Sequence, residues 1–209
     1  MKPFLILTVL ATFPLFAQHT LPFASTGNTV ELAITNSSSV SASNVVVAIA
    51  DQPQFLKFIE QKTQFSNLKP NETATAAFTF SVDKYATVNQ PQQITFTITG
   101  STGEQWTKQI SVQVAPPDHF ELFQNFPNPF NPPTTISYQL PVDSHIALKI
   151  YNSIGQEVKA LVNDERSAGY HQETWNASDV ASGMYIYQLT LTNGQGKKEF
   201  YRKKMLVVK

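Results

Sequence analysis

Histidine is the first residue type to test for chemistry, because its imidazole binds metals and transfers protons near neutral pH. No histidine has a second histidine two or four residues away, and no HExxH motif occurs in the chain. The sequence therefore predicts no zinc site, and we expect the histidines at the surface. They are His19, His119, His145 and His171.

Nucleophilic and phosphate-binding motifs are also missing from the sequence. There is no GxSxG elbow, no GxGxxG loop and no Walker loop, so neither a serine hydrolase nor a nucleotide cofactor is predicted. Ser182 precedes Gly183 in an expected turn and is not interpreted as a nucleophile. The absence of cysteine excludes a cysteine nucleophile, a disulfide framework and a lipidated N-terminal cysteine. We expect no cofactor and no enzymatic activity.

Two weaker candidates for ligand binding come with ordinary structural alternatives. Asn163-Asp164-Glu165 carries oxygen ligands suited to calcium, but an exposed acidic turn is the favoured interpretation because no further oxygen ligands are evident. Phe55, Tyr85 and Trp106 have the ring faces of a sugar-binding platform, although aromatic residues of β-sandwiches usually belong to the core.

The balanced charge of the chain argues against binding to polyanions. Fifteen Lys and Arg balance fifteen Asp and Glu, so no net field attracts nucleic acid or an anionic membrane. Charged residues make up only 14% of the chain and hydrophobic residues 42%, so Ser, Thr, Asn and Gln must supply the surface polarity. This profile is typical of extracellular β-sandwiches.

The N-terminus has the pattern of an export signal. Lys2 is followed by an apolar run, Phe4 to Phe16, which is shorter than the roughly 20 residues of a membrane-spanning helix. Cleavage is predicted after Ala17, where Leu15-Phe16-Ala17 precedes Gln18. The implied partners are the Sec translocon and signal peptidase. The alternative is a buried first strand or helix.

Alternation of apolar and polar residues predicts a β-rich first half. Short segments with β-branched and aromatic residues are separated by turn clusters such as Asn36-Ser37-Ser38-Ser39, at the spacing of an immunoglobulin-like sandwich. The expected strands are 29–35, 44–50, 73–81, 93–99 and 106–114.

A proline-rich boundary at Ala115-Pro116-Pro117-Asp118 separates this half from a second set of strands. We therefore expect an all-β protein with two antiparallel, immunoglobulin-like sandwiches, in which Asn193-Gly194 forms a hairpin turn. The expected strands are 134–140, 145–151, 157–162, 170–175, 184–192 and 198–208. The expected organisation is a signal peptide at 1–17, a passenger domain at 18–115, a linker at 116–124 and a second domain at 125–209.

Several spaced motifs in the second half resemble the C-terminal sorting domain of cargo secreted by the type IX secretion system. The resemblance covers roughly residues 119–209 and is carried by Asn125–Pro132, Thr134–Pro141, Ile150–Val158, Ala168–His171, Ser182–Leu189 and Lys203–Lys209. It implies a seven-stranded β-sandwich recognised by the outer-membrane translocation components of certain Gram-negative bacteria. It also implies prior Sec export and a location outside the cell or at its surface.

The family resemblance also implies possible fates of the protein after translocation. In some members a sortase-like peptidase removes the domain and the cargo is attached to anionic lipopolysaccharide, whereas others stay attached or are released. If this chain is cut, the exposed segment from Ala115 to Gln124 is the expected place.

The candidate residues of the sorting signal combine a stiff lead-in, turn glycines and a basic end. Asn-Pro pairs favour extended or turn backbone, Phe126 and Phe130 are expected to pack under the sheet, and Trp175 is expected in the core. Residues 197–209 carry six cations against Glu199, and recognition or protection from aggregation explains them equally well. The candidates are Asn128, Pro129, Phe130, Asn131, Pro132, Gly155, Gly183, Tyr185, Lys203, Lys204 and Lys209.

The first half resembles, more weakly, bacterial adhesion-related and alpha-galactosidase-associated immunoglobulin-like modules. The resemblance rests on Leu32–Asn36, Ala42–Val47 and Leu68–Ala74, and departs from the usual pattern at Asn71, where glycine is common. Three hypotheses follow: an adhesion or protein-binding passenger whose ligand is unknown, a truncated or accessory tail of a secreted hydrolase, and a carbohydrate-binding module.

Overall fold

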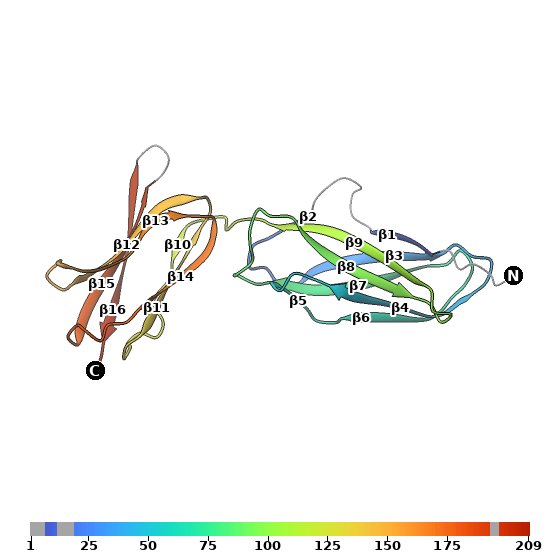
Figure 1. Ribbon diagram of the computed structural model, residues 1–209, viewed down its shortest axis with the longest axis horizontal. Helices are drawn as coiled ribbons and strands as arrows, with labels where there is room; N and C mark the ends of the chain where they lie inside the picture. Colours follow the sequence, from blue (N-terminus) through green and yellow to red (C-terminus); the bar gives the residue numbers. More distant parts are fainter. Residues whose placement is uncertain (1–6, 12–18, 193–196) are drawn as a thin grey trace. The chain divides into compact units, whose positions relative to one another are not determined.

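The computed structural model describes residues 7–11, 19–192 and 197–209, and all regular structure in this part of the chain is β-strand (Figure 1). The predicted all-β class is confirmed. The chain divides into two compact units, Met1–Ala115 and Pro116–Lys209, here called the first and second units. None of the described residues belongs to a helix capable of crossing a membrane.

The first unit contains two sheets of antiparallel strands with one parallel pair. The parallel pair is β2 with β9, where His19 lies opposite Val112. One sheet has the order β1 (Leu7–Ala11), β3 (Asn28–Asn36), β7 (Thr73–Val82), β5 (Leu56–Phe58). The other has the order β2 (His19–Leu21), β9 (Gln105–Val114), β8 (Gln92–Thr99), β4 (Ala42–Asp51), β6 (Lys62–Leu68).

The core of the first unit is formed by strands in which buried apolar residues alternate with more exposed ones. Leu32 and Ile34 of β3 are fully buried, and Phe78 of β7 contacts Phe96 of β8 with ring centroids 5.3 Å apart. Because neighbouring residues of a strand point to opposite faces, every second residue is buried against the facing sheet. β5 and β6 were not predicted, because β5 has only three residues and β6 is a polar edge strand.

Two asparagines close adjacent turns at one end of this unit. The fully buried Asn36 side chain donates hydrogen bonds from Nδ2 to the carbonyls of Val40 and Leu68, both at 2.8 Å. Asn71 has a φ of 61°, and its backbone N–H donates to the Asn36 carbonyl at 2.7 Å. Asparagine tolerates this left-handed backbone better than most residues, so it serves where the resembling modules have glycine.

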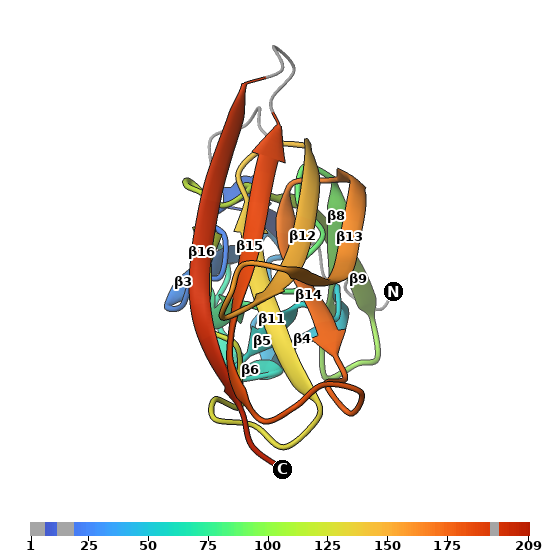
Figure 2. The same cartoon turned by 90° about the vertical axis from the view of Figure 1, so that its left-hand side faces the viewer.

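The described residues of the second unit form seven strands, the number that the family resemblance implied. A three-stranded sheet has the order β10 (Glu121–Leu122), β11 (Thr134–Leu140), β14 (Gly169–Trp175). A four-stranded sheet has the order β13 (Glu157–Arg166), β12 (Ser144–Asn152), β15 (Gly183–Thr192), β16 (Lys198–Val207), as Figure 2 shows from the β16 side.

The core of the second unit lies between these two sheets. Ile136 and Tyr138 of β11 are fully buried together with Leu148 of β12 and Leu189 of β15. Trp175 is a core residue as expected. Its ring centroid is 5.8 Å from that of Phe130 and 5.6 Å from that of Tyr185.

Three sequence expectations for loops need comment. Asn163-Asp164-Glu165 lies within β13 and not in a turn, because β13 pairs with β12 as far as Arg166. The expected linker at 116–124 includes β10, and Leu122 of that strand is a buried core residue. The predicted hairpin turn at Asn193-Gly194 lies outside the described residues.

The N-terminal prediction falls largely outside the described residues as well. Lys2 and the predicted cleavage site at Ala17 are not among them. Leu7–Ala11, within the apolar run, forms β1 and pairs antiparallel with β3.

Candidate functional site

The segment between β10 and β11, residues 123–133, lies against β16, and we call this segment the lead-in. The Phe130 N–H donates to the Leu206 carbonyl at 3.0 Å, and the Val208 N–H donates to the Phe130 carbonyl at 2.9 Å. Asn128 Oδ1 accepts from the Leu206 N–H at 2.9 Å, and Gln124 Nε2 donates to the Lys204 carbonyl at 2.8 Å. The lead-in and β16 therefore hold each other in place.

A buried polar cluster anchors the start of this lead-in. The Asn125 N–H donates to Tyr187 Oη at 2.9 Å, and Tyr187 Oη donates to the Phe123 carbonyl at 2.8 Å. Asn125 Nδ2 donates to Thr134 Oγ1 and to the Pro127 carbonyl. Burial raises the pKa of Tyr187 to about 12, because the phenolate would lose its water. The cluster keeps the backbone around Asn125 in one conformation.

The two phenylalanines of the lead-in behave differently. Phe130 is buried, as predicted, and its ring also contacts that of Trp175. The expectation that Phe126 also packs under the sheet is wrong, because its side chain is 81% exposed. Its backbone forms a bridge with Thr135, and this pairing fixes the main chain without burying the ring.

β16 presents a mixed basic and apolar row on the outer face of its sheet. On this face, exposed residues alternate with inward ones such as Met205, and they are Lys198, Phe200, Arg202, Lys204 and Leu206. On the neighbouring strand, exposed Met184 lies directly opposite Leu206, and Ile186 lies opposite Lys204. We call Met184, Ile186, Phe200, Arg202, Lys204 and Leu206 the terminal-strand face.

A hollow of about 460 Å³ adjoins this face. Arg202 reaches across to β15, where its Nε donates to Gln188 Oε1. Asn152 fixes the neighbouring turn, since its Oδ1 accepts from the N–H groups of Ile154 and Gln156. The hollow is lined by Tyr151, Asn152, Ser153, Gly155, Ile186, Gln188 and Arg202. The hollow thus combines the Arg202 cation with side-chain amides and the Tyr151 ring. These groups suit a polypeptide surface that offers carboxylates or carbonyls.

The two candidate glycines and Tyr185 have structural roles near this face. Gly155 has a φ of 82°, and its N–H donates to the Asn152 carbonyl in the turn after β12. Gly183 begins β15 and pairs with Val207. Tyr185 is buried against Trp175, and its hydroxyl donates to the Ala181 carbonyl at 2.9 Å.

The basic candidates do not form one cluster. Lys203 lies on the opposite face of β16 from Lys204, half-buried beside Phe120 and Tyr201. Lys209 is held at the end of the chain, where its Nζ donates to the Ser178 carbonyl at 2.7 Å. Among the lead-in candidates, Pro129 and Asn131 are exposed and Pro132 is half-buried. Only Lys204 of these lysines belongs to the terminal-strand face.

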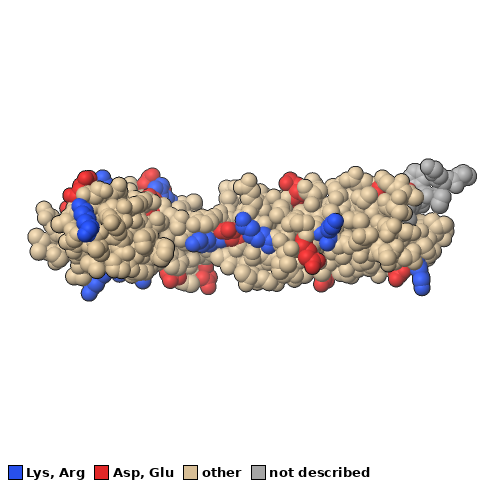
Figure 3. All heavy atoms as spheres, turned by 90° about the horizontal axis from the view of Figure 1, so that it is seen from below, with Lys and Arg blue, Asp and Glu red and all other residues tan. Residues whose placement is uncertain are grey.

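Charge is sparse on the surface. On the face drawn in Figure 3, acidic and basic side chains are scattered among uncharged ones. The six cations of residues 197–209 are therefore a local excess in a neutral chain.

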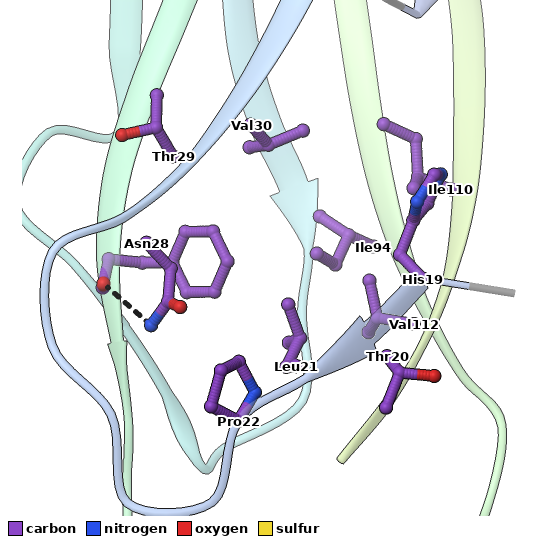
Figure 4. A pocket seen from close by; sticks show the side chains of 11 residues that line it. His19, Thr20, Leu21, Pro22, Asn28, Thr29, Val30, Ile94, Ile110 and Val112 are labelled. Carbon is purple, nitrogen blue, oxygen red and sulfur yellow. Dashed lines mark hydrogen bonds between the residues drawn. The ribbon is translucent and has the colours of Figure 1, made fainter. Parts of the chain in front are cut away.

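A cavity of about 210 Å³ lies in the first unit between β2 and β3 (Figure 4). In the figure, Leu21, Val30 and Ile94 extend into the space between the two strands, and Asn28 Nδ2 donates to the Phe80 carbonyl. Apolar side chains form most of the lining, together with His19, Thr20, Asn28 and Thr29. It suits an apolar side chain better than a sugar, since few polar groups converge on it.

The residues considered for chemistry are not arranged as a site. Trp106 lies opposite Ile98 near the end of β8, whereas Tyr85 lies in the loop that precedes β8, so about 20 Å of strand separates them. Tyr85 and Trp106 therefore do not share a sugar-binding platform. Among the described residues no group of three or more His, Asp or Glu side chains could hold a metal. Asp164 instead contacts Arg166.

Sequence reasoning missed Asn125, Tyr187 and Arg202 as central residues. Asn125 sits in a run of Asn and Pro that indicates a turn, and nothing in that run indicates burial. Tyr187 occupies an inward position of β15, and this alternation was the available signal. Arg202 was counted with the basic residues, but its position beside Gln188 follows only from strand pairing.

Comparison with known proteins adds one family match. Residues 124–207 match the family model described as the secretion system C-terminal sorting domain, which confirms the resemblance for this part of the chain. The match lies within the second unit. None of the curated proteins compared matches the chain.

The solved structures that match the chain are only distantly similar to it. Dimeric latent PorU from Porphyromonas gingivalis is 14% identical with a TM-score of 0.38, and the alignment covers 99% of this chain and 20% of that one. The chain thus spans about a fifth of that protein. A protein of unknown function from Porphyromonas gingivalis W83 is 13% identical, with a TM-score of 0.35 and coverage of 96% and 97%. The CupB2 chaperone of Pseudomonas aeruginosa is 11% identical, with a TM-score of 0.32 and coverage of 93% and 99%.

Proposed function

We propose that the chain is a non-enzymatic protein, exported through the Sec translocon and sorted across the outer membrane by its second unit through type IX translocation components. The match of residues 124–207 to a secretion sorting domain carries this proposal. The first unit, an immunoglobulin-like passenger, serves adhesion or protein binding at the cell surface or in the medium. Signal peptidase removes residues 1–17.

The terminal-strand face is our candidate for recognition by the translocation components. It combines cations with exposed apolar side chains, Phe200 at 56% and Leu206 at 43% exposure. Exposed apolar residues next to charges are typical of protein-binding surfaces. Because the alternate residues Met205 and Val207 already fill the core, the outward residues are free to serve recognition.

A sortase-like peptidase that removes the sorting unit would cut beside Asp118, which is exposed and lies within the expected segment 115–124. From Phe120 onward the chain packs against Tyr201 and enters β10, so its backbone is paired. Proteases cut backbone that lacks such pairing. Attachment of the released passenger to lipopolysaccharide would then follow at its new C-terminus.

The test replaces surface residues and keeps the strand. The double variant Arg202→Glu with Lys204→Glu reverses charge on the terminal-strand face, and Lys57→Glu with Lys62→Glu makes the same charge change at exposed positions of the first unit. Fractionation of the native host with mass spectrometry should find the first variant retained in the periplasm and the second outside the cell. Equal unfolding midpoints of both purified variants establish that folding is unaffected. Export of both variants alike would contradict the proposal.

A further inference from the structure

One strand of the first unit has its outer edge paired with residues of the predicted signal peptide. β3 pairs with β7 along Asn28–Thr35 on one side. On its other side β3 pairs with β1 over Leu32–Asn36, where Ala11 lies opposite Leu32 and Leu7 opposite Asn36 (Figure 1). β1 falls inside the stretch that we propose signal peptidase removes, so this inference rests on that part of the proposed function.

Removal of β1 leaves β3 as an edge strand over all nine of its residues. The unpaired N–H and C=O groups of such an edge pair readily with another extended chain. With β1 in place, Val30, Leu32 and Ile34 behind this edge are at most 3% exposed. Losing β1 therefore exposes backbone hydrogen-bonding groups next to a folded apolar interior.

The cavity of the first unit adjoins the same edge. Asn28, Thr29 and Val30 line it from β3, in the part of the strand that β1 does not reach, and Leu21 and Pro22 line it from the other side. An antiparallel strand that continues the β1 register places its next alternate residue opposite Val30. Residues directly opposite each other in an antiparallel pair lie on one face of the sheet, so that side chain points toward the cavity.

We propose that the mature protein binds an extended segment of another polypeptide by strand addition to the β3 edge, at the place where residues 7–11 pair with β3 in the full chain. The segment carries apolar residues at alternate positions, opposite Asn36, Ile34, Leu32 and Val30. The residue opposite Val30 is the largest, because it fills the cavity of about 210 Å³. Main-chain bonds supply affinity, and the cavity supplies specificity.

The test starts from chain exported in a bacterial host, with mass spectrometry of the intact product to establish that it begins at Gln18. A product that keeps its leader would refute the export proposal and remove the premise of this one. With mature protein in hand, the probe is a synthetic peptide with the sequence of residues 5–13, Leu-Ile-Leu-Thr-Val-Leu-Ala-Thr-Phe. Its binding is followed by calorimetry.

Two backbone-modified peptides separate strand addition from nonspecific apolar adhesion. One carries N-methyl groups at the positions of residues 7, 9 and 11, and the other at those of residues 8 and 10. Alternate N–H groups of a strand point to opposite sides, so one peptide should lose at least tenfold in affinity and the other should bind nearly as well. A peptide with Phe13→Ala should bind several-fold more weakly. Equal binding of all four peptides, or no saturable binding, would overturn the proposal.

Hydrogen exchange and cross-linking test whether the peptide binds at the β3 edge. Peptide binding should slow amide exchange in β3 while leaving the edge strand β6 unchanged. Because the chain has no cysteine, Thr35→Cys should form a disulfide with a peptide carrying Thr8→Cys, its antiparallel partner, and the matched variant Thr63→Cys on β6 should not. Protection of β6 in place of β3, or a mature dimer whose β3 edges exclude the peptide, would contradict the assignment.

Discussion

Replacement of Tyr187 by phenylalanine tests whether the buried polar cluster holds the lead-in segment. The hydroxyl donates to the Phe123 carbonyl and accepts from the Asn125 N–H, and the Tyr187 side chain is fully buried. Its removal leaves one carbonyl and one N–H in the interior without their partner. An unsatisfied buried group costs about 1–3 kcal/mol, so we expect a loss of about 2–4 kcal/mol in the free energy of unfolding of the second unit.

Tryptophan fluorescence can measure the second unit by itself. The chain has two tryptophans, Trp106 in the first unit and Trp175 in the core of the second. In a Trp106→Phe background the fluorescence of Trp175 reports on the second unit alone. With a urea slope of about 1–2 kcal/mol/M, the expected loss lowers the unfolding midpoint by about 1–4 M.

Tyr201→Phe is the matched control. Its hydroxyl donates to Glu199 Oε2 on the surface, so the same atom is removed without stranding a buried group. We expect a change below about 0.5 kcal/mol. If Tyr187→Phe changes the midpoint no more than Tyr201→Phe does, the buried cluster does not stabilise the second unit and the reasoning is wrong.

Three other predictions concern the same units. Phe130→Ala should cost about 3–5 kcal/mol in urea unfolding followed by Trp175, while Phe126→Ala should change the midpoint little because that ring is exposed; equal losses would contradict the burial difference. Folding raises the pKa of Tyr187 from 10 to about 12, so its neutral form contributes about 2–3 kcal/mol of stability below pH 10 that is lost as pH rises to 12. Titrating stability from pH 8 to 12 should show a shallower alkaline fall in Tyr187→Phe than in the parent chain, and identical slopes would refute the assignment. Asn71→Ala should lower the thermal midpoint of the first unit by the equivalent of about 1 kcal/mol while Asn71→Gly does not, since only alanine strains a φ of 61°; a similar effect of both would argue against backbone strain.

Strands with clear alternation were predicted well from the sequence. Residues 134–140 form β11 with the expected bounds, and the strand expected at 73–81 differs from β7 by one residue. These segments alternate because one face is buried, and burial imposes the period of two. Asn71, noted in the sequence because glycine is common at that position, has a left-handed backbone with a φ of 61°.

Other elements depend on partners that local pattern does not reveal. β6 is polar along most of its length and becomes a strand through its pairing with β4. β10 has two residues, and they form a strand because Leu122 reaches the core beside β11. Edge strands and short strands take their conformation from the sheet they join.

The candidate site was predicted in part. Asn128 and Phe130 do lie together with β16, because both contact Leu206 through hydrogen bonds. The basic residues were expected as one group, yet strand alternation puts Lys203 and Lys204 on opposite faces. A count of charges along the sequence ignores this alternation. Which lysines share a face becomes known only when the buried side of the strand is known.

The closure of the lead-in onto β16 makes the folding of the second unit depend on residues 205–208. A polypeptide that stops short of Leu206 lacks the carbonyl and N–H that Phe130 and Asn128 bind, and one that stops before Met205 also lacks two core residues. Synthesis proceeds from the N-terminus, so the surface formed by these residues exists only on chains that extend through β16. Machinery that reads this surface would thereby pass over prematurely terminated products without inspecting the passenger.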